Sequence, residues 1–294
     1  MRLTVLGMGG MGRGFAKRAM ERGHRVTVWN RTPGRADELV ARGATEARTA
    51  SDAVARADVT LVVLTDDEAV LDVCVGIDGA LASVAQGAIL VNVSTVSPEA
   101  ARELAEAGPA NSVLDAPVLG SPAGVAAGAG RFLIGGPPET VRRLDPLWSD
   151  IGAGYVHCGP VGTGAAMKLM CNLQLIIGVA AFAEAIGTAR AAGIDDDLLR
   201  TLFTDSPFVS QTTKSRVDAV FDPRHPGWFT PELARKDVRL AIEMAERRGI
   251  PVRLGPAAEN LLTAVIEGDS ARWPDFAAVI EAFSRPYRPT RPAS

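Results

Sequence analysis

A glycine-rich turn beginning at residue 7 constrains the fold of this chain more than any other feature. The β-branched run Leu3 to Leu6 leads directly into the turn, and a helical stretch follows it. In such a strand–turn–helix setting the first glycine permits the tight turn, the second lets the backbone approach a pyrophosphate, and the third allows close packing of helix on strand. N–H groups at the helix start then face the phosphates. Unless the turn merely connects two elements, it predicts a dinucleotide site formed by Gly7, Met8, Gly9, Gly10, Met11 and Gly12.

Strand-like and helical segments alternate through the first half of the chain. Ala- and Arg-rich stretches such as 10–22 and 34–42 separate short β-branched runs. This alternation predicts a largely parallel sheet with helices on both faces. The expected strands are 3–6, 25–29, 59–64, 88–93, 112–115, 131–134 and 155–157.

Beyond Gly162 the strand signals disappear from the sequence. We expect a long helix over about 165–191, and then helical segments near 196–203, 231–248, 256–267 and 275–283, each stopped by glycine-containing turns. The chain is therefore expected to hold an α/β Rossmann-type N-terminal domain and an all-α C-terminal domain, joined by a long interdomain helix. The expected bounds are 1–161 for the nucleotide domain, 162–192 for the helix, 193–284 for the helical domain and 285–294 for a mobile tail.

Composition argues against several classes of protein. The net charge of the 294 residues is -3, which gives no electrostatic footprint for nucleic acid. Cys74, Cys158 and Cys171 are odd in number and lack metal-ligand spacing, so we expect neither a disulfide framework nor a metal site. The N-terminus is too short for a signal peptide, and the apolar run 173–185 falls short of a membrane span. We therefore expect a cytoplasmic protein without a nucleic-acid or membrane partner.

The end of the second expected strand indicates which dinucleotide binds. A site for NAD usually carries an acidic residue about 20 residues beyond the glycines, but this chain has Asn30-Arg31-Thr32 there. No carboxylate repels a 2′-phosphate, and Arg31 can bind one by charge-assisted hydrogen bonds, although it could also be an ordinary solvated arginine. The sequence predicts NADP(H) in preference to NAD(H). Its expected contacts include Asn30, Arg31, Thr32, Leu64 and Thr65.

A second motif, Gly162 to Asn172, places Lys168 and Asn172 four residues apart at the start of an otherwise apolar helix. Residues so spaced share one helix face, and a charge and an amide are costly to bury without partners. Lys168 could be partly exposed there, with Asn172 turned to water. The position at the expected domain junction favours a functional pair, because clefts between domains are common ligand sites.

Five motifs in order along nearly the whole chain resemble the β-hydroxyacid dehydrogenase family, which includes 3-hydroxyisobutyrate dehydrogenase and glyoxylate/succinic semialdehyde reductases. They are the turn at 7–12, the segment 92–98 (similar to D-x-S-T-x-x-P), the loop 115–121 (similar to D-A-P-V-S-G-G), the stretch 162–172 and the triplet 236–238 (similar to K-D-L). The resemblance implies an NADPH-dependent oxidoreductase that interconverts a small aldehyde or keto acid and its hydroxy acid. It also implies a homodimer.

The resemblance assigns catalysis to Lys168 and Asn172. Hydride transfer to a carbonyl develops negative charge on its oxygen, which an ammonium can stabilise and protonate. A free lysine has a pKa near ~10.4, and burial and a nicotinamide positive charge would lower it. Asn172 would hold the substrate or orient Lys168.

The remaining contacts implied by the resemblance come from three regions of the chain. Substrate contacts fall to Ser94, Thr95, Gly120 and Ser121, and further cofactor contacts fall to Thr95 and Lys236. Phe229, by its place shortly before Lys236 rather than by the resemblance, is expected to wall the nicotinamide pocket. Phe229 could instead pack between helices, and Lys236 could be a salt-bridged surface residue.

The substrate loop departs from the family pattern. Leu119-Gly120-Ser121 stands where the family has Ser-Gly-Gly, and Pro122 has no N–H to donate. The substrate could therefore be a small semialdehyde acid or a bulkier, less charged carbonyl, and the loop could be a connection without ligand contacts. Two other functions stay open: imine reduction, whose enzymes generally carry another residue where Lys168 stands, and a catalytically silent nucleotide-binding protein, which typically lacks that lysine.

Overall fold

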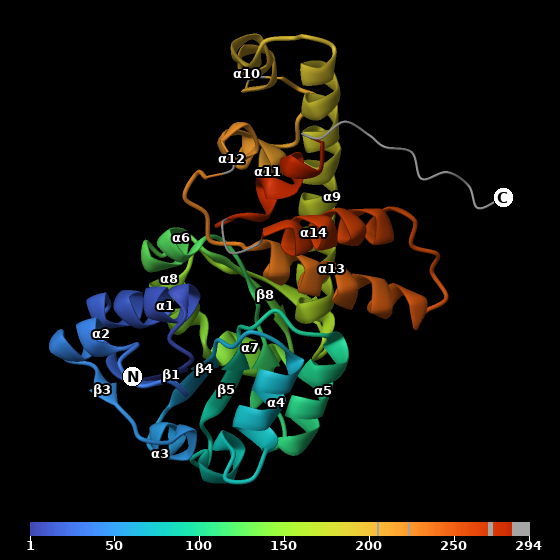
Figure 1. Ribbon diagram of the computed structural model, residues 1–294. Helices are drawn as coiled ribbons and strands as arrows, with labels where there is room; N and C mark the ends of the chain where they lie inside the picture. Colours follow the sequence, from blue (N-terminus) through green and yellow to red (C-terminus); the bar gives the residue numbers. More distant parts are fainter. Residues whose placement is uncertain (205, 223, 270–272, 284–294) are drawn as a thin grey trace. The chain divides into compact units, whose positions relative to one another are not determined.

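The computed structural model describes residues 1–204, 206–222, 224–269 and 273–283 (Figure 1). The expected tail at 285–294 lies outside the described residues. The chain divides into two compact units, Met1–Leu169 and Met170–Ser294. This division falls inside helix α9 (Thr163–Ala191), whereas the sequence-based boundary precedes it.

One mixed sheet forms the centre of the first unit. Its order is β3-β2-β1-β4-β5-β6-β8-β7, with β9 beside β8. Strands β3 to β6 in this order run parallel, β8 is antiparallel to β6 and β7, and β9 is parallel to β8. Strand order reverses at β1, and open α/β sheets bind ligands at the carboxyl ends of the strands beside such a switch point. The strands are β1 (Arg2–Leu6), β2 (Arg25–Trp29), β3 (Thr45–Glu46), β4 (Val59–Val62), β5 (Ile89–Asn92), β6 (Val113–Asp115), β7 (Val118–Leu119), β8 (Arg131–Gly135) and β9 (Tyr155–Gly159).

Helices cover both faces of this sheet (Figure 1), which confirms the predicted α/β class. Leu3 and Val5 of β1 belong to a core with α1, α2 and α8, whereas Leu6 faces a second core with α3, α4 and α5. Burial on both faces explains why these strands read as continuous apolar runs. The helices are α1 (Gly10–Glu21), α2 (Asp37–Ala41), α3 (Ala50–Val54), α4 (Asp67–Val75), α5 (Pro98–Ala107), α6 (Pro122–Ala126), α7 (Pro138–Arg143) and α8 (Asp145–Ile151), with a 3₁₀ turn at Ala80–Ser83.

The regular elements of the second unit, among its described residues, are helices joined by loops. Buried side chains of α9 recur at Ile176, Val179, Ala183 and Ile186, a spacing that places one stripe against the helical core. Residues 275–283, expected as an α-helix, contain a 3₁₀ helix at Phe276–Phe283 instead. The other helices are α10 (Asp196–Thr204), α11 (Gln211–Lys214), α12 (Val217–Phe221), α13 (Pro231–Glu246) and α14 (Leu254–Asp269).

Helix α9 includes the apolar run 173–185 and begins two residues before the expected helix. By length and composition alone the whole helix is long and apolar enough to cross a membrane, although the run within it is shorter. Its buried stripe in the helical core gives the apolar composition another cause, since core helices of folded domains pass the same test.

Candidate active site

The glycine turn between β1 and α1 leaves space that fits a dinucleotide. A Cβ on Gly7, whose φ is 101°, would lie 2.2 Å from the Val63 carbonyl oxygen, and a Cβ on Gly12 would lie 1.8 Å from the Gly7 carbonyl oxygen. Neither position can hold a side chain. By contrast, a Cβ on Gly9 would meet no described atom within 4 Å. Helix α1 begins at Gly10 without a side-chain cap or an acidic residue in its first turn, so its N-terminus suits a phosphate group.

Asn30 braces this turn against the end of β2. Its Oδ1 accepts a hydrogen bond from Met8 N–H at 2.9 Å, and its Nδ2 donates to the Thr32 carbonyl oxygen at 2.8 Å. The amide thus fixes the spacing between the pyrophosphate turn and the segment that carries Arg31. The sequence indicated Asn30 only as a contact of the cofactor, because its two partners depend on the fold.

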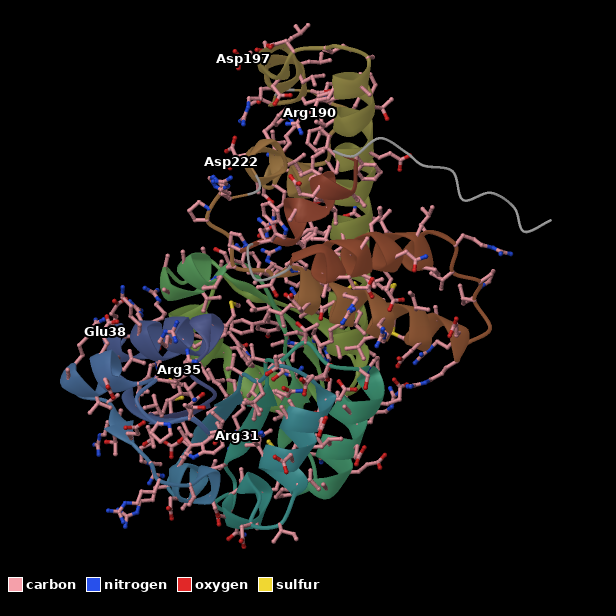
Figure 2. All side chains as sticks on the ribbon, viewed as in Figure 1. Arg31, Arg35, Glu38, Arg190, Asp197 and Asp222 are labelled. Atoms are coloured by element: carbon pink, nitrogen blue, oxygen red, sulfur yellow. The ribbon has the colours of Figure 1, made fainter. Side chains whose placement is uncertain are left out.

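Arg31 lies on the segment between β2 and α2 together with Arg35 (Figure 2). Its Nη2 is 3.0 Å from Oδ2 of Asp72 on α4, and both side chains are about two-thirds exposed, at 67% and 65%. An exposed pair of this kind contributes little stability. The guanidinium is therefore able to exchange Asp72 for another anion at small cost.

The ends of β4 and β5 are joined by the Ser94 hydroxyl. Ser94 Oγ accepts a hydrogen bond from Leu64 N–H at 2.9 Å and donates to the Val62 carbonyl oxygen at 3.2 Å. Ser94 is 3% exposed, so its hydroxyl serves the sheet edge. Thr95 is half-buried and Thr65 is exposed at the same edge.

The expected substrate loop forms the start of a short helix. Ser121 caps α6 by accepting a hydrogen bond from Gly124 N–H at 3.1 Å, and Pro122 occupies the first helical turn, where a missing N–H costs nothing. Cβ atoms built on Gly10 and Gly14 of α1 would lie 3.3 and 3.0 Å from atoms of Pro122, so this loop packs directly on the cofactor helix.

Asp115, at the end of β6, joins the sheet to α9. Its Oδ1 accepts a hydrogen bond from Gly162 N–H at 2.8 Å, and its Oδ2 accepts one from Ala165 N–H at 2.7 Å. The side chain is 1% exposed. Burial raises the pKa of this carboxyl, and hydrogen bonds from Gly162 and Ala165 oppose the rise. Lys168 follows in the same helix, three residues after Ala165.

Asn172 is held by a buried carboxylate in the second unit. Its Nδ2 donates to Asp237 Oδ2 at 2.6 Å, and the Nζ of Lys236 lies 2.8 Å from Asp237 Oδ1. Asn172 and Asp237 are 7% and 2% exposed. Asn172 is therefore not turned to water, and Lys236 is salt-bridged as one sequence-based alternative held. The Asn172–Asp237 contact was not foreseen, because it joins residues 65 positions apart.

Phe229 and Trp228 precede α13 on a segment fixed by an ion pair. Phe229 is 6% exposed, and its ring lies 5.2 Å from that of Phe276 in a tilted contact. Arg216 Nε lies 3.2 Å from Asp275 Oδ1, and its guanidinium lies 4.9 Å from the centroid of Trp228. Burial raises the pKa of Asp275, and the charge of Arg216 opposes this rise. Phe229 thus packs between elements, while its predicted cofactor contact stays a prediction.

The buried amide of Asn172 provides a test of this network. Asn172→Asp would place a second carboxyl group beside Asp237 where both side chains are buried. Because two like charges repel strongly at such a site, we expect one of the two carboxyl groups to be protonated. A group forced to a raised folded-state pKa keeps its stability at low pH and loses it as pH rises through that pKa. We expect the variant to lose about 3 kcal/mol of unfolding free energy at pH 8 and less at pH 5, measured by urea titration at both values.

Gln174→Glu is the matched control, since it places the same charge on an exposed position of the same helix. We expect it to unfold like the wild-type protein at both pH values. A pH-independent loss in Asn172→Asp would contradict a direct contact between the new carboxyl group and Asp237.

Comparison with known proteins agrees with this architecture. Residues 2–159 match the NAD binding domain of 6-phosphogluconate dehydrogenase, and residues 162–283 match the NAD-binding domain of NADP-dependent 3-hydroxyisobutyrate dehydrogenase. The chain is 32% identical to 3-hydroxyisobutyrate dehydrogenase of Pseudomonas aeruginosa over 91% of its length and 93% of the relative's. It is 33% identical to glyoxylate/succinic semialdehyde reductase 2 of Arabidopsis thaliana, covering 95% of this chain and 78% of that protein.

Solved structures show the same relationship. The structure of Mycobacterium tuberculosis 3-hydroxyisobutyrate dehydrogenase with L-serine superimposes with a TM-score of 0.82 at 28% identity, covering 97% of this chain and 100% of that chain. An imine reductase from Myxococcus stipitatus shares the fold, with a TM-score of 0.65 at 23% identity. The chain belongs to the β-hydroxyacid dehydrogenase family and is an NAD(P)-dependent oxidoreductase acting on CH–OH groups.

Proposed function

We propose that this protein interconverts a small aldehyde or keto acid and its hydroxy acid with NADP(H), and that Lys168 transfers the proton. The observation that carries the proposal is a set of three contacts at the carboxyl ends of the strands in the first unit. Asn30 touches the glycine turn, Ser94 bridges to Leu64, and Asp115 holds the start of the helix that bears Lys168. These contacts support a site in which the cofactor turn and Lys168, as the proposed proton donor, both lie in the first unit.

We assign residues at these strand ends to cofactor binding, proton transfer and substrate binding. Gly9 and the start of α1 would hold the pyrophosphate, and the bound cofactor would supply or accept the hydride. Lys168 as an ammonium would stabilise the developing oxyanion and give it a proton; as a neutral amine it would take the proton back in oxidation. We assign Thr95 and the Ser121 hydroxyl to the substrate, together with Gly120. Ser94, whose hydroxyl is used within the sheet, would shape the edge beneath the substrate.

The loop at the end of β7 bears on the identity of the carbonyl substrate. Leu119 lies in β7, and the next two residues form the turn and the cap of α6. An apolar side chain there favours a carbonyl whose substituent is less charged than the family pattern implies. The relatives named above act on 3-hydroxyisobutyrate, or on glyoxylate and succinic semialdehyde, by their names. Phe229 and Lys236 in the second unit, and assembly as a homodimer, stay proposals; sedimentation as a monomer would contradict the latter.

A cofactor-consumption screen tests the proposed function. Purified protein is given NADPH or NADH with glyoxylate, succinic semialdehyde, a set of larger aldehydes and cyclic imines, and the loss of absorbance of the reduced nicotinamide is followed. We expect turnover of at least one aldehyde or keto acid, and no turnover of the imines. Turnover of imines alone would favour imine reduction, and no turnover of any compound would favour a silent nucleotide-binding protein.

The choice between the two nicotinamide cofactors rests on Arg31. Because a charge-assisted hydrogen bond contributes about 1.5–3 kcal/mol, we expect Arg31→Ala to lower kcat/KM about 10- to 100-fold with NADPH. With NADH it should change little. Asp72→Asn, which removes the present partner of Arg31, should leave NADPH use equal or improved.

Arg42→Ala is the control for this series, because Arg42 is an exposed arginine whose recorded partner is Glu21, at 3.7 Å. It should behave like wild type with both cofactors. Wild-type efficiency of Arg31→Ala with NADPH, or equal efficiency of the wild type with NADH, would overturn the proposed preference.

A further inference from the structure

The start of α9 is attached to the sheet through a single carboxylate. Asp115 accepts hydrogen bonds from the N–H of Gly162, the residue before α9, at 2.8 Å and from the N–H of Ala165 in the first helical turn at 2.7 Å. These bonds connect residues 47 and 50 positions apart in the chain. Both oxygen atoms are thus used on one helix start, and the negative charge lies where the helix dipole favours it.

Three glycines surround this carboxylate and fix its place. A Cβ on Gly135, the neighbour of Asp115 in β8, would lie 2.3 Å from Asp115 Oδ1. A Cβ on Gly164 would lie 2.9 Å from Asp115 Oδ2 and 2.3 Å from the Leu133 carbonyl oxygen. Gly162 has a φ of 93°, which side-chain-bearing residues rarely adopt. The helix start can approach the sheet this closely because side chains are absent at Gly135 and Gly164, whereas glycine at position 162 permits the positive φ.

The attachment lies one turn before Lys168. Ala165 and Lys168 are three residues apart in one helix, so they are neighbours on its surface. The two hydrogen bonds at Gly162 and Ala165 restrain rotation and sliding of the helix at the next turn. The position of the Lys168 Cα relative to the strand ends therefore depends on Asp115.

We propose that Asp115 is a positioning residue for Lys168, which sets the register of the catalytic helix on the sheet edge and never itself contacts the substrate. The inference rests on the proposed function, in which Lys168 transfers the proton. A misplacement of a catalytic group by about 1 Å can cost on the order of 100-fold in rate. The Asp115 side chain is 1% exposed, so we do not expect its carboxyl group to exchange a proton directly with a bound substrate.

A double-mutant cycle on turnover tests the proposal. Asp115→Asn keeps the shape of the side chain, but its NH₂ group must face one of the two N–H donors, so one bond becomes a repulsive contact. We expect kcat to fall about 10- to 100-fold, while the KM of the carbonyl and the dissociation constant of NADPH change less than about threefold. In a Lys168→Ala background the same substitution should have no further effect on kcat, because its only route to the reaction is gone.

Two further variants separate positioning from general destabilisation. Gly164→Ala displaces the helix start without altering any charge and should reproduce the fall in kcat, so the proposal stays testable if Asp115→Asn folds poorly. Leu147→Ala, in the buried core of the same unit, should lower the melting temperature without changing kcat below the transition. Gly268→Ala, whose added Cβ would meet no described atom within 4 Å, controls for glycine replacement in a helix.

Different results would overturn the positioning role of Asp115 and the proposed proton transfer by Lys168. Equal effects of Asp115→Asn in the wild-type and Lys168→Ala backgrounds, or a wild-type kcat in both Asp115→Asn and Gly164→Ala, would overturn the positioning role while leaving Lys168 in place. A wild-type kcat in Lys168→Ala would overturn the proposed function itself. A shift of the pH profile of kcat in Asp115→Asn, absent from Leu147→Ala, would support the positioning role.

Discussion

Lys168→Ala is expected to lose about 10³-fold in kcat while it still binds NADPH, because a positioned general acid contributes about 10²- to 10⁴-fold. Asn30 holds the glycine turn, and Asp72 is the partner of Arg31. Cofactor binding, followed by the change in nicotinamide fluorescence on titration, should therefore stay near the wild-type value. Turnover of the best substrate from the screen is measured on the same preparation.

Two controls sharpen this result. Lys168→Arg keeps the positive charge but replaces the amine by a group that stays protonated throughout the accessible pH range. It should therefore retain part of the oxyanion stabilisation and lose proton transfer in both the reduction and the oxidation direction. Lys17→Ala removes an exposed lysine from α1 and should change neither. Near-normal turnover in Lys168→Ala would remove this residue from the mechanism.

Local patterns in the sequence were sufficient to predict most of the longer strands of the first unit and its glycine turn. The strand 25–29 was predicted with the bounds that β2 has in the structure, and the glycine turn was predicted in place, because a buried strand and a tight turn each depend on adjacent residues. The two-residue strands β3 and β7 were missed, since two residues cannot show an alternating pattern. Helices α11 and α12 were missed for a similar reason, being four and five residues long.

The substrate loop carries a second local signal that the sequence analysis did not use. Ser121 followed by Pro122 is a common helix start, with a hydroxyl cap and a proline in the first turn. The family resemblance implies a substrate contact for Ser121, and that contact stays a prediction. The structure shows the cap, and any contact of the same hydroxyl with substrate has to use the proton that the cap does not engage.

The contacts that organise the candidate site could not be predicted from the sequence. The bonds of Asp115 to the start of α9, and that of Asn172 to Asp237, each join residues 47 or more positions apart. Their side chains meet only after the sheet order and the helix packing are established. The sequence shows glycine at positions 135 and 164, where a side chain would collide with Asp115. Only the structure identifies Asp115 as the side chain that needs this space.

Alanine substitutions in the glycine turn are expected to have the second large effect. Gly12→Ala should lose both stability and NADPH binding, whereas Gly9→Ala should lose NADPH binding alone. In Gly12→Ala the added Cβ would lie 1.8 Å from the Gly7 carbonyl oxygen, a distance that forces α1 away from β1. We expect a loss of about 3 kcal/mol in unfolding free energy, as for other overpacked sites, and a loss of NADPH binding of more than about 100-fold. In Gly9→Ala the Cβ would meet no described atom within 4 Å, so the melting temperature should stay near that of the wild type.

Gly9→Ala should nevertheless weaken NADPH binding at least about tenfold, because its methyl group occupies the space through which the backbone approaches the pyrophosphate. Comparing the two variants by thermal unfolding, with and without NADPH, separates damage to the fold from damage to the site. The wild-type protein should gain melting temperature with NADPH, and Gly9→Ala should gain much less from the same starting point. If Gly9→Ala gained as much as the wild type, the open space at Gly9 would not be where the cofactor phosphates bind, and the pyrophosphate site would have to be sought elsewhere along the strand ends.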